Sequence, residues 1–328
     1  MADAVVQAGL PDHWSGTGVS ISTILEQLVR LRRAFDHRAS RTRVMTLVVV
    51  GSTEGDVARA AAAMHGLGDH HPARLVVLRP EPHSRTSGID AEIQVYATSS
   101  DDHPVFFEQI ELRVRGSGCA HLDSIVEPFT LSDLPVVVWY PGALPAVSDG
   151  LLPVASTVLV DTREAGELGT LADLVELARR RPVVDLSWER LRPWRELLAG
   201  LFEGPVYRPF ARGVSSIDVE GKGGPRRLLA GWLLSRLGTG RTVELHDARH
   251  VSVRLVASSH GQEATFEAVR SASERMVRAG ASVVGGPAHH ELLVLPDDSL
   301  AWSLSRALTH LRRDRVWEQA LAVAVGLG

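Results

Sequence analysis

Apolar residues recur along the chain at two spacings, which predict alternating strands and helices. Short apolar runs rich in valine predict buried strands at 44–50, 75–78 and 135–142. Helical spacing predicts a helix at 21–35, and Thr53 is suited to cap a second, alanine-rich helix. The first two strands and the helix between them make a βαβ unit, so these strands are expected to be parallel.

Strict alternation of apolar and polar residues follows this unit. Segments 89–98 and 105–115 alternate and are separated by a polar loop, which predicts a hairpin and therefore a mixed sheet. Helices are expected near 119–129 and 171–178, and a last strand at 157–161. The second half repeats the order strand, helix, strand and hairpin. Its expected strands are 214–219, 241–245, 251–257, 262–269, 274–278 and 292–295, and its expected helices are 226–237, 299–311 and 316–325.

These patterns predict an α/β protein with two α/β domains, each a mixed, mostly buried sheet flanked by helices. A chain of 328 residues is too long for one ordinary core. Residues 162–170 mix charge, Gly and Thr, so the boundary is placed there. The expected parts are a flexible N-terminal arm at 1–18 and domains at 19–166 and 167–328. The repeated order of elements allows a degenerate duplication of one fold.

Composition and charge narrow the functional classes. A net charge of −4 argues against a nucleic-acid-binding protein, which carries a basic excess. Cys119 is the single cysteine, which excludes an internal disulfide and fits a reducing compartment. No charged start precedes an apolar segment, and no run of eighteen apolar residues occurs. We therefore expect no secretory signal, no membrane span and a cytoplasmic location.

Residues 183–202 combine an apolar run with tryptophans and arginines. Ser187 is suited to be a helix N-cap, and Trp188 and Trp194 share one apolar stripe at helical spacing. Pro193 predicts either a short turn followed by a helix with the proline in its first turn, or one kinked helix. Tryptophan and arginine dominate protein contacts, but most apolar stripes face a core. From the residues alone, a core-facing helix is favoured.

Glycine-rich turns and histidines give weak signals of chemistry. The Gly51 turn follows a strand and opens a helix, where phosphates bind, but it lacks the G-x-G-x-x-G spacing and carries an acidic residue. Segment 221–225 has the same position without P-loop spacing, and a simple turn is favoured. His121 and Asp123 would be half of a metal site or of a Ser-His-Asp set, with no second half evident. The sequence predicts no catalytic residue, no cofactor and no metal site.

Several segments in combination resemble the glucose-6-phosphate dehydrogenase assembly protein family, OpcA-like, of actinobacteria and cyanobacteria. The resemblance extends from about Val19 to the C-terminus. It is carried by residues 43–50, 71–74, 121–124, 133–142, 185–202 and 229–238.

The resemblance implies a non-catalytic protein that binds glucose-6-phosphate dehydrogenase and promotes its assembly or allosteric activation. It would thereby serve the oxidative pentose phosphate pathway and NADPH supply. Cyanobacterial members are linked to thiol-redox control, which Cys119 alone cannot provide through an internal disulfide.

For such a protein, the tryptophans and arginines are candidates for a partner surface. The residues predicted to contact the dehydrogenase are Trp188, Arg190, Arg192, Trp194, Arg195, Trp139 and His121. One alternative is a sugar-phosphate or nucleotide-binding α/β enzyme that uses the Gly51 turn with His121 and Asp123. Another is a self-associating structural protein. Nucleic acid and membranes are not expected partners.

Overall fold

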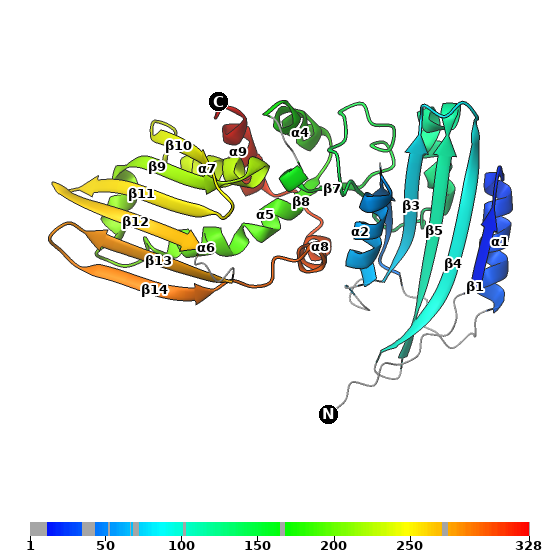
Figure 1. Ribbon diagram of the computed structural model, residues 1–328, viewed down its shortest axis with the longest axis horizontal. Coiled ribbons are helices and arrows are strands. Elements are labelled where there is room, and N and C mark those ends of the chain that lie inside the picture. Colours follow the sequence, from blue (N-terminus) through cyan, green and yellow to red (C-terminus); the bar gives the residue numbers. More distant parts are fainter. Residues whose placement is uncertain are drawn as a thin grey trace. The chain divides into compact units, whose positions relative to one another are not determined.

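A computed structural model describes residues 12–34, 43–51, 53–65, 67, 72–100, 103–164, 168–270 and 275–327. The chain forms two compact units (Figure 1). The N-terminal unit ends at Val160 and also includes Arg181–Val183 and Leu308–Arg312. The C-terminal unit begins at Asp161 and contains the rest of the chain. The domains 19–166 and 167–328 differ from these units in detail and stay a prediction about which parts fold independently.

The N-terminal unit is built on a mixed eight-stranded sheet. Its strands, in spatial order, are β1 (Asp12–Gly16), β4 (Gly88–Ser100), β5 (His103–Arg115), β3 (Ala73–Glu81), β2 (Met45–Val50), β6 (Val136–Trp139), β7 (Thr157–Val160) and β8 (Val183–Asp185). Strands β2, β3, β5, β6 and β7 run parallel, and β4 pairs antiparallel with β5. The predicted βαβ unit and hairpin are both confirmed.

Two longer helices and several short turns accompany this sheet. Helix α1 (Ile21–Ala34) packs on β1 and β4, and α2 (Glu54–His65) packs on β2. The helix predicted near 119–129 is broken into η2 (Gly116–His121), α3 (Leu122–Val126) and η3 (Glu127–Phe129). The central strands β2 and β6 consist mainly of buried apolar residues, as strands covered on both faces require.

The prediction of a flexible N-terminal arm at 1–18 needs a correction. Residues 12–16 form the edge strand β1, which pairs antiparallel with β4 from Asp12 opposite Val95 to Gly16 opposite Ala91. The alternation of the segment is short and its apolar content low, so its pairing depends on the neighbouring strand. Residues 1–11 of the predicted arm lie outside the described residues.

The C-terminal unit carries a six-stranded mixed sheet. Its strands, in spatial order, are β10 (Thr242–Asp247), β9 (Val214–Gly221), β11 (Ser252–Ser259), β12 (Gln262–Arg270), β13 (Met276–Val283) and β14 (Ala288–Val294). Only β9 and β10 run parallel; the other neighbours are antiparallel. In the N-terminal unit the hairpin lies beside the second strand of the βαβ unit, whereas here it lies beside the first. The duplication therefore rests on the shared βαβ unit alone.

The C-terminal unit also contains helices, of which α7 (Gly223–Leu237) is the longest and is largely buried. The others are α4 (Leu168–Arg180), α5 (Leu186–Arg190), α6 (Arg192–Gly200), α8 (Leu300–Thr309) and α9 (Arg315–Val325), with short turns η4 (Thr162–Glu164) and η5 (Arg208–Gly213). Helix α7 packs closely on α9, because Gly231 has no side chain where a Cβ would lie 2.2 Å from the Ala320 carbonyl oxygen. Among the described helices, none combines the length and the apolar character needed to cross a membrane.

Candidate functional site

The tryptophan and arginine segment begins at the end of β8. Asp185 is the N-cap of α5, and its side chain accepts a hydrogen bond from the Ser187 amide at 3.0 Å. The predicted N-cap at Ser187 is therefore wrong. The Ser187 hydroxyl donates instead to Asp161 at 2.6 Å, because the aspartate two residues earlier already accepts from the helix end. Pro193 lies in the first turn of α6, which confirms the short turn followed by a new helix.

Two buried carboxylates organise this segment from within. Asp185 accepts from the Thr162 amide at 3.1 Å, from the Thr162 hydroxyl at 2.8 Å and from the Trp317 indole at 3.3 Å. Burial, followed by the charge of Asp161, raises the pKa of Asp185 to about 6. Arg190 donates to both oxygens of Asp161, at 2.9 and 2.8 Å, and both side chains are 7% exposed. This ion pair is part of the core.

The tryptophans of the segment are also buried. Trp188 is 2% exposed and donates its indole N–H to Asp314 at 2.8 Å. The Arg195 guanidinium lies 3.5 Å above the Trp188 ring, and burial lowers the pKa of Arg195 to about 10. Trp194 is 4% exposed, and Trp139, on β6 of the N-terminal unit, is 0% exposed. Fully buried rings offer no surface to a partner in this conformation.

Some of the residues predicted for partner contact are thus buried, and others are accessible. The C-terminal unit brings Trp188, Arg190 and Arg195 together inside its core. Arg192 remains 36% exposed with a distant Glu189 carboxylate at 3.9 Å, and His121 is exposed at the end of η2. The role of these residues in binding stays a prediction, for which Arg192 and His121 have the accessible side chains.

A pocket rich in arginine lies in the same unit, and we call it the basic pocket. It has a volume of about 790 Å³ and occupies the end of the sheet where β9, β10, β12 and β14 terminate. It is lined by Arg163, Lys222, Pro225, Arg249, His250, Val251, Arg270, Arg275, Pro296, Asp297 and Asp298. A smaller recess shares Arg270, Asp297 and Asp298 with it and is also lined by Arg190 and Trp194.

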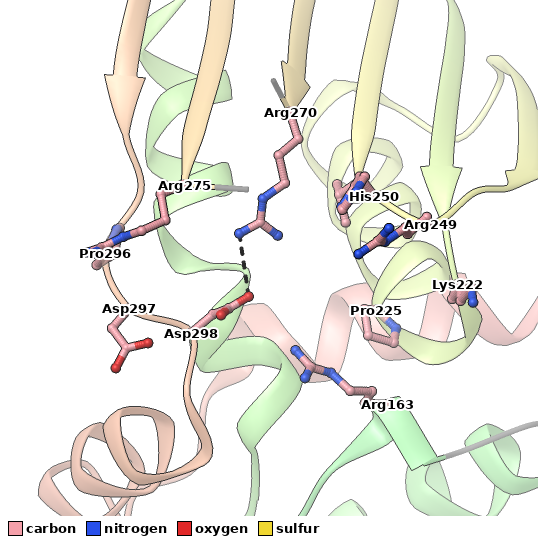
Figure 2. A pocket seen from close by; sticks show the side chains of 11 residues that line it. Arg163, Lys222, Pro225, Arg249, His250, Arg270, Arg275, Pro296, Asp297 and Asp298 are labelled. Carbon is pink, nitrogen blue, oxygen red and sulfur yellow. Dashed lines mark ion pairs between the residues drawn. The ribbon is translucent and has the colours of Figure 1, made fainter. Parts of the chain in front are cut away.

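Figure 2 shows how the side chains of the basic pocket lie. The guanidinium groups of Arg163, Arg249 and Arg270 point toward the middle of the pocket from three separate segments. Arg270 pairs with Asp298 at 3.5 Å, and Asp297 lies on the same side as Asp298 (Figure 2). The carboxylates thus lie on the side of the pocket that also carries Arg275, and Arg249 and Lys222 lie on the opposite side (Figure 2).

The turn between β9 and α7 forms part of the pocket. Gly221 and Gly223 have φ of 148° and 53°, which side chains rarely adopt. A Cβ on Gly224 would lie 2.3 Å from the Thr162 carbonyl oxygen, so this helix end lies directly against η4. Lys222 is the N-cap of α7 without a side-chain hydrogen bond to the helix, and the first turn contains no acidic residue. This backbone suits an anion.

Sequence reasoning missed the basic pocket. It singled out segment 221–225 but favoured a simple turn, because the segment lacks the spacing of a phosphate-binding motif. The arginines come from η4, from the loop before β11 and from the ends of β12 and β13, and only the pairing of the strands brings them together. The one signal in the sequence was that basic residues recur just after predicted strands.

The Gly51 turn is closed by its own carboxylate. Asp56 accepts from the Thr53 amide at 3.0 Å and from the Thr53 hydroxyl at 2.9 Å, and its own amide donates back to that hydroxyl at 3.2 Å. Burial raises the pKa of Asp56, but the hydrogen bonds from Thr53 and Arg59 outweigh it and lower the pKa overall. A negative charge thus already lies where a phosphate would bind.

His121 and Asp123, which were predicted to act with the Gly51 turn in a sugar-phosphate or nucleotide-binding enzyme, do not complete a site at that turn. Within the described residues, neither His121 nor Asp123 forms a hydrogen bond or an ion pair with the Gly51 turn. In the same part of the chain, no group of three or more His, Cys, Asp or Glu side chains is arranged to hold a metal. The enzyme that would use the Gly51 turn is not favoured.

Comparison with known proteins identifies the family. The model of the glucose-6-phosphate dehydrogenase subunit N-terminal domain matches residues 65–179, and that of the subunit's C-terminal domain matches 181–321. The chain belongs to the OpcA family of glucose-6-phosphate dehydrogenase assembly proteins. The two models meet at the end of α4, so each of the two halves of the chain has its own counterpart in the OpcA family.

Curated relatives agree with this assignment. The OxPP cycle protein OpcA of Synechocystis sp. is 27% identical over 180 residues, which cover 51% of this chain and 37% of the relative. That of Synechococcus elongatus is 26% identical over 252 residues, which cover 73% of this chain and 52% of the relative. The chain thus spans about half or less of the length of these OpcA proteins. A solved structure of a Gal80p mutant from Saccharomyces cerevisiae has a TM-score of 0.41 and 12% identity, covering 80% of this chain and 82% of its own.

Proposed function

We propose that this chain is a non-catalytic protein that binds glucose-6-phosphate dehydrogenase and promotes its assembly or its activity. The observation that carries the proposal is the match of both halves to the two domains of a family described as a subunit of that dehydrogenase. The chain would thereby act in the oxidative pentose phosphate pathway, in agreement with the names of its relatives. The cytoplasmic location predicted from the single cysteine belongs to the same proposal.

Activation by a binding protein requires a difference in affinity. The chain can shift the dehydrogenase toward an active form only by as much as it binds that form more tightly than the inactive one. A coupling free energy of about 1–3 kcal/mol changes the population of the active form roughly 5- to 150-fold. This effect needs a stable surface and no reaction centre in the chain.

Arg192 is the appropriate residue for mapping the interface. It is 36% exposed on α6, and replacement by Glu reverses its charge and removes one long ion pair, with the buried Glu189 at 3.9 Å. Arg190, by contrast, pairs with Asp161 in the core, so its substitution would change the fold and the surface together. Arg179, on the exposed side of α4, provides a matched control.

The test measures dehydrogenase kinetics against glucose 6-phosphate, with and without the full chain. A lower KM at unchanged kcat indicates activation through substrate binding, and a larger active fraction indicates assembly. Co-purification is then compared for the wild type, Arg192→Glu and Arg179→Glu. We expect Arg192→Glu to weaken retention and Arg179→Glu to leave it unchanged. If the wild-type chain neither co-purifies with the dehydrogenase nor alters its kinetics, the proposal is wrong.

A further inference from the structure

We propose that the basic pocket binds a small phosphate ester that also carries hydroxyl groups, such as a sugar phosphate or a nucleotide. The site differs from the Gly51 turn, and we assign no reaction to it. The proposal does not depend on the dehydrogenase as a partner, because it concerns a ligand of the isolated chain.

The charge of the pocket is the first argument. Four arginines and one lysine line it against two aspartates, so permanent positive charges are in excess even with His250 neutral. Three guanidinium groups point toward a common space, and one of them, that of Arg270, also pairs with Asp298 at 3.5 Å. A guanidinium presents several N–H donors in a planar fork, and this geometry matches the oxygens of a phosphate. A phosphate group in the middle of the pocket would therefore accept charge-assisted hydrogen bonds and offset the excess positive charge.

The backbone supplies the second argument. Helix α7 is long, and its amino end, with Lys222 as N-cap, lies at the pocket without a capping side chain. Its first turn has no acidic residue, in contrast to α2, where Asp56 occupies the equivalent position. In open α/β sheets, ligands bind beyond the carboxyl ends of the strands, and phosphates bind at helix amino ends of this kind.

The aspartates select among anions. Asp297 accepts from the Ser299 hydroxyl at 2.7 Å and from the Ser299 amide at 3.0 Å, which lower the pKa of Asp297 and keep it an ionised acceptor. With Asp298 it would repel a ligand that is anionic throughout but would accept hydrogen bonds from hydroxyl groups. A volume of about 790 Å³ is ample for a molecule that has a phosphate at one end and hydroxyls at the other.

The test is calorimetric titration of the full chain with glucose 6-phosphate, ADP, inorganic phosphate and unphosphorylated glucose. We expect glucose 6-phosphate or ADP to bind with the highest affinity, inorganic phosphate more weakly and glucose not at all. Glucose 6-phosphate and ADP separate a sugar phosphate site from a nucleotide site. Each substitution Arg163→Gln and Arg249→Gln is expected to weaken binding about tenfold, since each removes charge-assisted hydrogen bonds.

Controls separate loss of binding from loss of folding. Arg254→Gln changes an exposed arginine on β11 outside the pocket and should leave affinity unchanged. Arg249→Lys keeps the charge but not the bidentate geometry, so its affinity should lie between those of the wild type and Arg249→Gln. Circular dichroism and the melting temperature without ligand show whether each variant is folded.

Two outcomes overturn the proposal. One is the absence of saturable binding of every phosphate to the folded wild type at about 10 mM ligand, a concentration far above the Kd of a specific site. The other is equal binding by the wild type and a folded Arg163→Gln, Arg249→Gln double variant. A third pattern would assign the pocket to a protein partner instead. In that pattern the double variant no longer co-purifies with the dehydrogenase, and no phosphate binds to the wild type or to the variant. The pocket would then receive acidic side chains of the partner.

Discussion

Replacement of Arg190 by Met tests whether the tryptophan and arginine segment is held from within. The substitution retains most of the side-chain volume but removes the guanidinium that donates to both oxygens of Asp161. Both partners are 7% exposed, so water cannot replace the lost hydrogen bonds. Removal of one member of a buried ion pair typically costs about 3–5 kcal/mol, because the other charge stays buried and uncompensated. We expect a loss of this size at about pH 7.5.

The loss of stability caused by Arg190→Met should depend on pH, and the pKa of Asp185 determines whether it grows or shrinks as pH rises. The pKa of Asp185 is raised to about 6, so its contribution to stability is complete below its unfolded-state pKa and is lost as pH rises through about 6. Without Arg190, the charge of Asp161 repels Asp185 more strongly and raises the pKa of Asp185 further. The variant should therefore lose more stability, relative to the wild type, at pH 7.5 than at pH 5, roughly across the window set by this pKa.

Urea denaturation followed by tryptophan fluorescence measures the effect, since Trp188 and Trp317 lie in the same cluster. The urea midpoint of the variant is compared with that of the wild type at both pH values. Arg254→Met, on the exposed side of β11, should leave the midpoint unchanged. A midpoint of Arg190→Met that equals the wild-type value at pH 7.5, or an equal loss at both pH values, would refute the reasoning.

Two further substitutions test the cores of the two units. Gly231→Ala should destabilise the chain by about 1–3 kcal/mol, measured by urea denaturation, because its Cβ would collide with the backbone of α9. Gly200→Ala, also in a helix but with nothing within 4 Å, should be neutral or stabilising, and destabilisation by both would contradict this explanation. In the N-terminal unit, Glu108→Gln should cost about 3–5 kcal/mol, since it leaves Arg32 and Arg74 without their buried carboxylate. Burial raises the pKa of Glu108, but the arginines lower it overall, so its stabilisation is lost as pH falls, and the acid sensitivity of the variant should be smaller.

Many strands and helices of the fold follow from the pattern of residues in their own segments, so they could be predicted from the sequence. Val-rich runs become the central strands β2, β3 and β6, because such runs must be buried on both faces. Alternation at 89–98 and 105–115 becomes the hairpin β4–β5, and Pro193 opens α6. These features depend on neighbours in the chain, so their periodicity is visible in the sequence. The family resemblance likewise rests on local segments, and the family models confirm it.

Long-range contacts decided the remainder. Strand β1 exists through its pairing with β4, and the Ser187 hydroxyl donates to Asp161, which lies between β7 and η4 and is 26 positions earlier in the chain. Tryptophan is a residue type that is common at partner surfaces, but Trp188 lies in the core, where its indole donates a hydrogen bond to Asp314. The basic pocket combines arginines that are far apart along the chain. A sequence fixes which side chains are cationic or apolar, whereas their partners and burial depend on how strands and helices pack together in space.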